Sequence, residues 1–259
     1  QIGDGTFGET EWWTTLDEPT RARIGLHLVA MRMRSGVIFE NILSRGLLAY
    51  AARLDNGDPE FRYTYHEVIE ESQHSLMFQE FVNRAGFDTG RLPLRMRLGA
   101  GRVVRLATRF PELFFVFVLG GEDPIDHVQR KALKERDVHP LLDRIMRIHV
   151  TEEARHLSFA RHQLKRSVPE LPRWKRTVLS YAAPLILAQM ADQMMGVPDH
   201  LAREYRIPAE VVDAVRRDPA QRAEVQASLA KVARLLDECG LRGRGPRRLW
   251  RRLGLEAVS

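Results

Sequence analysis

The sequence predicts an all-α protein built on a bundle of four long helices, with additional helices packed around this core. Apolar residues recur at helical spacing over long stretches, whereas the alternating pattern of half-buried strands is weak. Clusters of Gly, Pro and Asp separate these stretches, as in "DNGDPE", "RAGFDTGRLP" and "SVPELP". Long helices joined by short connections are typical of an antiparallel bundle.

The breaks between apolar stretches set the expected helices. The four long helices should cover residues 18–54, 59–85, 111–136 and 140–166. Further helices are expected over residues 94–108, 174–195, 209–217 and 219–238. Pro124 follows two glycines inside the third long helix, so we expect a kink or a locally unwound turn there.

Composition indicates an ordinary globular protein. The 259 residues suffice for a sizeable core, and 44% are apolar and 29% charged. The single cysteine, Cys239, excludes an internal disulfide and favours a reducing, cytoplasmic location. Residues 178–195 are the most apolar run, but Pro184 and Asp192 interrupt it, so we expect a buried helix and no membrane span.

The positive charge is concentrated near the end of the sequence. The net charge is +6, and the stretch "RGRGPRRLWRR" contains six arginines and no acid. We therefore expect residues 1–240 to form one domain and residues 241–259 a basic tail, solvated and partly disordered. The rest of the chain is nearly neutral, so we expect no nucleic-acid partner.

Each of the four long helices places an acidic residue on its apolar face. Glu40 has apolar or small neighbours at helical spacing, and Glu122 directly follows "FFVFVLGG". The second and fourth helices contain Glu-x-x-His in "EVIEESQH" and "IHVTEEARH". Offsets of three and four residues put such side chains on one helix face. Buried acids and histidines need a partner, which can be a hydrogen bond, an opposite charge or a metal.

The chain order is Glu, Glu-x-x-His, Glu, Glu-x-x-His, which is the ligand set of ferritin-like bundles that hold two metal ions. Two Glu-x-x-His pairs could arise by chance. A metal site is therefore indicated by the order of these motifs along the chain, together with the long helices and the apolar neighbours. Carboxylates with a few imidazoles suit iron or manganese. An extra imidazole, one turn before the last pair, should alter how an iron-bound peroxide reacts. The sequence therefore predicts a dinuclear centre built by Glu40, Glu71, His74, Glu122, His149, Glu153 and His156.

Several nearby residues receive other roles. Glu67 could replace Glu71, but a solvated position is favoured, and Glu70 and Glu152 should point away from the metals. Asp126 could hydrogen-bond a ligand imidazole or form a plain salt bridge. The aromatic residues Phe114, Phe115 and Phe117 are expected in the core, and surface or capping positions are expected for His27, His66, His127, His139, His162 and His200.

The seven predicted ligands together resemble the signature of the p-aminobenzoate N-oxygenase family. These are bacterial non-haem di-iron enzymes of aureothin and chloramphenicol biosynthesis. Their pattern of Glu, Glu-x-x-His, Glu and His-x-x-x-Glu-x-x-His reads here as Glu40, "EESQH", "GGED" and "HVTEEARH". The likeness extends from "GTFGETEWW" to the end of the fourth long helix, and the third histidine distinguishes this family from ribonucleotide reductase small subunits.

The resemblance implies an enzyme in which the seven residues hold two irons, with carboxylates bridging. It implies reaction with dioxygen through a peroxo-di-iron species, and oxidation of an arylamine through hydroxylamine and nitroso stages to a nitro group. Manganese, or a mixed pair, would also suit these ligands. Electrons must come from an external reductant or redox protein, since the sequence has no flavin, haem or nicotinamide motif. We also expect a homodimer, and Arg203 or Arg206 could pair with a substrate carboxylate.

Three other functions remain compatible with the sequence. The same scaffold could carry a di-iron C-hydroxylase, a desaturase or a cleaving oxygenase, which product analysis would separate. It could instead be a metal-binding, ferroxidase-type protein without an organic substrate. It could also be a structural bundle whose acids are only salt-bridged, and failure to bind metal after reconstitution would favour that last function.

Overall fold

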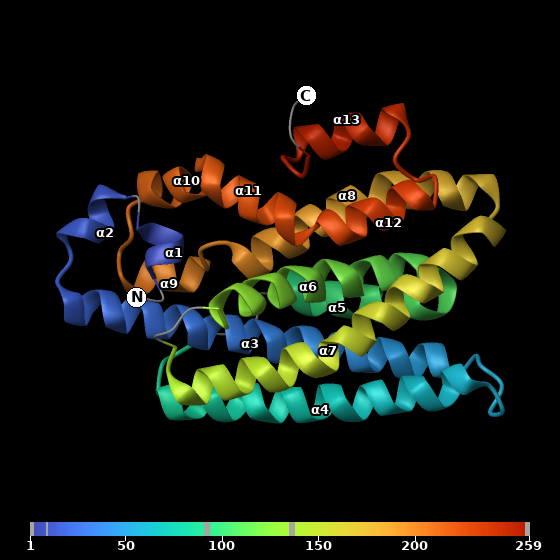
Figure 1. Ribbon diagram of the computed structural model, residues 1–259, viewed down its shortest axis with the longest axis horizontal. Coiled ribbons are helices and arrows are strands. Elements are labelled where there is room, and N and C mark those ends of the chain that lie inside the picture. The colour runs from blue at the N-terminus through green and yellow to red at the C-terminus, as the bar shows by residue number, and fades with distance from the viewer. Residues whose placement is uncertain (1–2, 9, 91–93, 135–137, 257–259) are drawn as a thin grey trace.

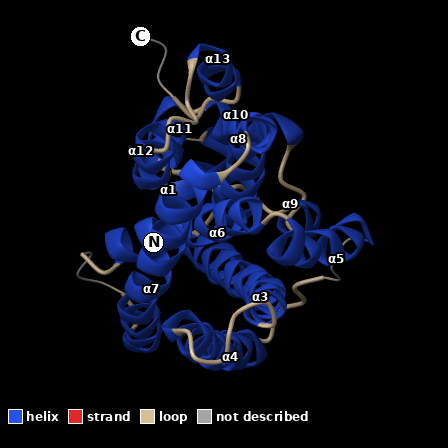
Figure 2. Ribbon diagram, turned by 90° about the vertical axis from the view of Figure 1, so that its right-hand side faces the viewer, coloured by secondary structure: helices blue, strands red, loops and turns tan. Residues whose placement is uncertain are grey.

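The computed structural model describes residues 3–8, 10–90, 94–134 and 138–256, and every regular element in these ranges is a helix (Figures 1 and 2). Four long helices form the core: α3 (Glu18–Ala51), α4 (Pro59–Ala85), α6 (Pro111–Ala132) and α7 (Pro140–Ser167). Helix α3 packs along α4, and α6 packs against α7. The predicted all-α bundle is therefore confirmed.

Local sequence signals set the helix ends. Helix α3 begins after Asp17, whose carboxylate accepts a hydrogen bond from the backbone N–H of Thr20 at 2.9 Å. Helix α4 ends at Gly86, which has a φ of 69°, a conformation that glycine adopts without strain. The predicted end of the third long helix at Arg136 lies outside the described residues, and α6 ends at Ala132.

Of the kink or locally unwound turn predicted at Pro124, the unwound turn does not occur: α6 is helical from Pro111 to Ala132 with this proline inside it. Proline removes one backbone hydrogen bond, but the neighbouring helices bury this part of α6 on all sides. Packing therefore maintains a helix that local propensity disfavours.

The remaining helices surround the bundle. Helix α5 (Leu94–Arg109) lies against α3 and α6, and α8 (Arg173–Met195) covers α6 (Figure 1). The helix predicted over residues 219–238 is divided at Leu229 into α11 (Pro219–Ser228) and α12 (Ala230–Glu238). The shorter elements are α1 (Asp4–Phe7), α2 (Glu11–Thr15), the 3-10 turn η1 (Val168–Glu170), α9 (Asp199–Glu204) and α10 (Ala209–Arg217).

The arginine-rich segment is not the solvated, partly disordered tail that its composition suggested. It forms helix α13 (Arg244–Arg252), which packs against α8, and its Trp250 is fully buried. The Arg242 guanidinium lies 4.4 Å from the centre of the Trp250 ring and pairs with Asp237 at 2.5 Å. The tryptophan anchors the helix, and most of its arginines remain on the outer side.

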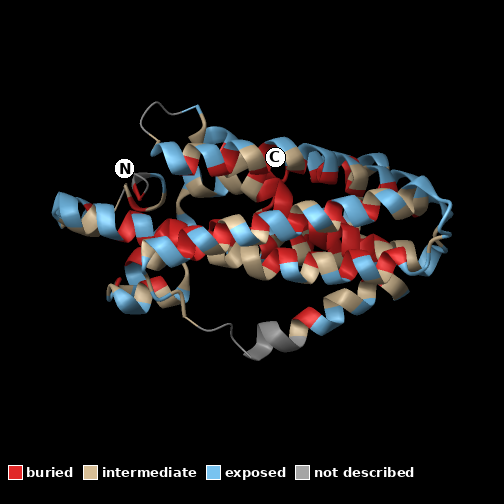
Figure 3. Cartoon of the chain, turned by 90° about the horizontal axis from the view of Figure 1, so that it is seen from below, coloured by how far each residue is buried: buried red, intermediate tan, exposed pale blue. Residues whose placement is uncertain are grey.

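Buried residues line the inward-facing sides of the long helices (Figure 3). Phe114, Phe115 and Phe117 belong to the main core, as predicted. Met190 of α8 is also part of that core. In the described part of the chain, no helix is long and apolar enough to cross a membrane.

Gly121 allows α6 to approach α3 closely, immediately beside Glu122. A Cβ atom at this position would lie 2.3 Å from the ring of Phe39, the neighbour of Glu40. Only a residue without a side chain fits at this distance. The glycine that weakens the helix by propensity thus brings two of the acidic helices together.

We expect Gly121→Ala to destabilise the metal-free protein by about 1–3 kcal/mol through overpacking, which exceeds the gain of up to about 1 kcal/mol in helix propensity. Chemical denaturation measures this change. The control is Gly101→Ala in α5, where a Cβ meets nothing within 4 Å and stability should be unchanged or higher. Equal stability of Gly121→Ala and the unaltered protein would contradict the close packing.

Candidate metal centre

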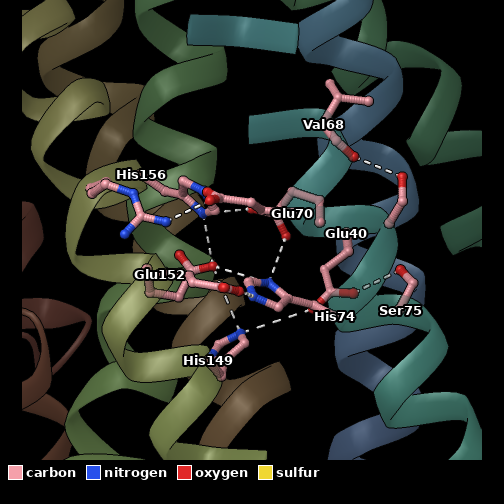
Figure 4. A network of polar contacts seen from close by, with 12 residues as sticks. Glu40, Val68, Glu70, His74, Ser75, His149, Glu152 and His156 are labelled. Atoms are coloured by element: carbon pink, nitrogen blue, oxygen red, sulfur yellow. Dashed lines mark hydrogen bonds and ion pairs between the residues drawn. The ribbon is translucent and has the colours of Figure 1, made fainter. Parts of the chain in front are cut away.

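The structure brings all seven predicted ligands together inside the bundle. Figure 4 labels four of them, Glu40, His74, His149 and His156. One acid comes from α3 and one from α6, whereas α4 and α7 each contribute a Glu-x-x-His pair. Helical spacing aims both pairs toward the bundle axis. None of the seven is more than 3% exposed: they are Glu40, Glu71, His74, Glu122, His149, Glu153 and His156.

Glu71 and Glu153 lie between the histidines. The two oxygens of Glu71 face different rings, with Oε2 at 3.4 Å from Nδ1 of His74 and Oε1 at 2.9 Å from Nδ1 of His156. Oε1 of Glu153 lies 3.0 Å from Nδ1 of His156, 3.5 Å from Nδ1 of His74 and 3.8 Å from Nε2 of His149. A carboxylate placed between two imidazoles in this way has the geometry of a bridging ligand.

The acids next to the Glu-x-x-His pairs hold the outer nitrogens of the histidines, contrary to the prediction that they point away. Nε2 of His74 donates to Glu152 at 2.7 Å, and Nε2 of His156 donates to Glu70 at 2.7 Å (Figure 4). Each bond joins α4 to α7. Because a carboxylate only accepts, Nε2 keeps its proton. Nδ1 faces the interior and becomes a ligand atom when the ring is neutral.

His149 is oriented by α6. Its Nδ1 lies 2.8 Å from the Oε1 of Gln129, so Nδ1 donates and Nε2 faces Glu40 and Glu153. Sequence reasoning considered Asp126 for such a bond, but Asp126 pairs with Arg130 at 2.8 Å. Of the two roles considered for Asp126, the plain salt bridge is therefore correct. The residue that orients His149 is Gln129, one helical turn further along.

Ser75 is another contact that sequence reasoning missed. Its hydroxyl donates to Oε2 of Glu40 at 2.7 Å (Figure 4). Oε1 of Glu40 makes no hydrogen bond with any described residue. A serine beside a predicted ligand carries no distinctive pattern. Its role follows from the packing of α4 on α3.

Two predictions of solvated or surface positions are wrong. Glu67 is only 1% exposed and lies with Glu71 and His156. His27 is 2% exposed, and its Nε2 donates to the backbone carbonyl of Asp88 at 2.9 Å. His139 caps α7, which is one of the two roles, surface or capping, that were predicted for it. Arg203 and Arg206, considered for a substrate carboxylate, are exposed.

Burial and mutual repulsion control protonation in the cluster. Burial, together with nearby carboxylates, raises the pKa of Glu40, Glu122 and Glu153. Burial opposes ionisation of His74, but the adjacent carboxylates raise its pKa to about 9. His149 behaves oppositely: burial and the charge of His74 lower its pKa to about 3, so its imidazole is neutral at pH 7.

The donor set fits a pair of metal ions. Both oxygens of Glu71, Oε2 of Glu153 and Nδ1 of His74 are buried and make no hydrogen bond in the described part of the chain. Ligand atoms gather in overlapping groups of three, and the atoms of each group lie within 4.8 Å of one another. The groups are Glu40, His74 and His149; Glu71, His74 and Glu153; Glu122, His149 and Glu153; and Glu67, Glu71 and His156. Burial disfavours the charged forms of Glu40, Glu122 and Glu153, and bound cations would favour them.

We expect divalent metal binding to release about one or more protons per ion, because ligands with raised pKa values must lose their protons. Since the pKa of His74 is about 9, affinity should rise as pH increases from neutrality towards that value. Calorimetric titration in buffers of different ionisation enthalpy counts the protons. Binding that is independent of pH, with no proton release, would contradict these pKa directions.

Comparison with known proteins extends the similarity beyond the metal-binding helices. Residues 4–240 match the p-aminobenzoate N-oxygenase AurF family, which has a helical, ferritin-like di-iron fold. An uncharacterized protein of Mycobacterium tuberculosis and one of Mycobacterium bovis are each 37% identical over 247 residues, covering 95% of this chain and 73% of each relative. The match includes α8 to α12, where the sequence alone showed little that was specific. The chain belongs to the p-aminobenzoate N-oxygenase AurF family.

Proposed function

We propose that this protein is a non-haem di-iron oxygenase that uses dioxygen to oxidise the nitrogen of a small aromatic amine to hydroxylamine, nitroso or nitro products. The single observation that carries the proposal is the placement of Glu71, whose two oxygens face histidines from two different helices. Family membership supports the oxygenase class. The buried cluster supports a dinuclear metal centre.

The residues of the chain would hold and orient the metals. Glu71 and Glu153 would bridge the ions, and His74 and His156 would bind through Nδ1. Glu40, Glu122 and His149 would complete the set. When bound, the iron pair supplies the reduction of dioxygen and the transfer of oxygen to the substrate. The same donor atoms would also bind manganese, so the identity of the metal as iron is part of the proposal.

Aromatic side chains next to the cluster would exclude water from it. Phe78 lies with its ring centre 5.1 Å from that of His149. The ring centres of Phe39 and Phe117, on the helices that carry Glu40 and Glu122, are 5.0 Å apart. All three are buried. Apolar walls favour oxidation of an organic substrate over exchange of hydrated ions. Electrons would come from a separate reductant or redox partner, and we expect a homodimer.

The test is a set of arylamines incubated with the iron-loaded, chemically reduced protein under isotopically labelled dioxygen. We expect labelled oxygen on the amine nitrogen, detected by mass spectrometry, with no product from metal-free protein. Label on a ring or alkyl carbon would instead identify a C-hydroxylase. Oxidation of ferrous iron without any labelled product from the set would favour a ferroxidase-type protein.

A further inference from the structure

Glu67 is a buried carboxylate to which the family signature gives no role. It lies on α4, one turn before Glu71, and is 1% exposed. Its Oε2 makes no hydrogen bond among the described residues, and neither does the hydroxyl of Tyr63 one turn earlier. A carboxylate in such surroundings must be neutralised, either by a proton or by a positively charged partner, because burying the bare charge is costly.

The position of Glu67 suits a metal ion. One of its oxygens, one Glu71 oxygen and a ring nitrogen of His156 all lie within 4.8 Å of one another. Ligand atoms on opposite sides of an ion are about 4 Å apart when each bond is about 2.1 Å long. A small adjustment would therefore let a single ion contact all three side chains.

A local sequence correspondence points to the same role. Residues 67–74, "EVIEESQH", and residues 149–156, "HVTEEARH", share Val, Glu, Glu and His at matching places. The matched glutamates Glu70 and Glu152 both bind the outer nitrogen of the histidine on the opposite helix. In this alignment Glu67 occupies the place of His149.

The two matched positions also have matched surroundings. His149 lies beside the histidine of the opposite helix, with its ring centre 4.7 Å from that of His74. Glu67 lies beside His156, which is likewise on the opposite helix. The approximate symmetry of the site thus extends one turn beyond the Glu-x-x-His pairs, with an imidazole at one end and a carboxylate at the other.

We propose that Glu67 is an eighth protein ligand of the metal centre, bound to the ion that His156 holds. This inference rests on the metal centre of the proposed function. It makes the two ions unequal, because the ion near His74 receives the neutral donor His149, whereas the ion near His156 receives an additional negative charge. Such a charge stabilises a trivalent ion more than a divalent one.

The experiment is an anaerobic titration of the metal-free protein with Co²⁺, whose visible absorption reports the number and type of ligands. We expect Glu67→Gln to bind one ion as the unaltered protein does and the other at least about 10–100-fold more weakly. The matched control is Glu80→Gln, on the same helix, where the acid is exposed and pairs with the exposed Arg84. The control should bind both ions normally.

A second variant and a stability measurement separate ligation from a purely structural role. Glu67→His places an imidazole where His149 has one, and it should change the Co²⁺ spectrum. Metal-free Glu67→Gln should be at least as stable to denaturation as the unaltered protein, because an amide replaces an unpaired buried carboxylate. Unchanged affinities in Glu67→Gln, or an unchanged spectrum in Glu67→His, would overturn the proposal.

The outcomes also distinguish this proposal from the proposed function. If the unaltered protein binds no Co²⁺, the metal centre fails and the role of Glu67 fails with it. If the unaltered protein binds both ions and Glu67→Gln behaves identically, only the role of Glu67 is refuted.

Discussion

Glu153→Ala is expected to reduce metal-dependent oxygen consumption by at least about 1000-fold, because it removes a carboxylate central to the site. Oε1 of Glu153 lies within 4 Å of a ring nitrogen of all three clustered histidines. Without it, the site would lose a carboxylate that could hold both ions. His74→Ala should have a comparable effect, since it removes the nitrogen ligand of one ion.

Oxygen uptake and bound metal should be measured together for these variants. The control is Asp143→Ala, also on α7, whose carboxylate pairs with the exposed Arg147. This variant should retain both metals and full oxygen uptake. Normal metal content and oxygen uptake in Glu153→Ala would show that the apolar face of α7 is not the reacting face.

Glu152→Ala is expected to weaken metal binding by about 10–100-fold, the usual effect of losing the partner of a ligand histidine. Its carboxylate accepts the Nε2 proton of His74 at 2.7 Å and thereby directs Nδ1 toward the centre. Glu70→Ala should act similarly through His156. If Glu152 pointed away from the metals, as the sequence alone predicts, Glu152→Ala would hardly change metal binding. This variant therefore distinguishes that prediction from the orienting role seen in the structure.

Competition with a chelator of known affinity measures this loss. Glu80→Ala serves as the control, because Glu80 is exposed and pairs with the exposed Arg84 on the outer side of α4. Glu152→Gln should retain part of the affinity, since its amide oxygen can still accept from His74. Affinity in Glu152→Ala equal to that of the control would contradict the orienting role.

The sequence predicted the bundle and the assembly of the seven ligands because both follow from local periodicity. Offsets of three and four residues are set by helix geometry, and apolar neighbours indicate the buried face. Glu71, His74, Glu153 and His156 could therefore be placed on inward faces without knowledge of the packing. Their identity as metal ligands stays a prediction that binding measurements must test.

The residues that support the site were harder to predict because their partners lie on other helices. Glu70 and Glu152 are on the flank of their own helices, and helical spacing alone suggests that they point away. A histidine ring is long enough for its outer nitrogen to reach the flank of the neighbouring helix. Glu67 shares the face of Glu71, but its burial depends on how α4 meets α7.

Contacts between residues far apart in the sequence also explain why His27 and the arginine-rich segment differ from their predictions. His27 is buried because Tyr205, 178 residues later, and the backbone at Asp88 fold over it. The arginine-rich segment is ordered by Trp250, a single apolar residue among many charges. Composition reports the average character of a segment, whereas one anchored aromatic side chain can determine its structure.

The most direct test of the dinuclear centre is the amount of ferrous iron that the metal-free protein retains after anaerobic loading and removal of excess metal. The structure predicts about two tightly bound iron ions per chain, because four helices supply the ligand set of a dinuclear site. Retention of no iron would contradict the account, and the buried acids and histidines would then serve only as ion pairs that hold the bundle together.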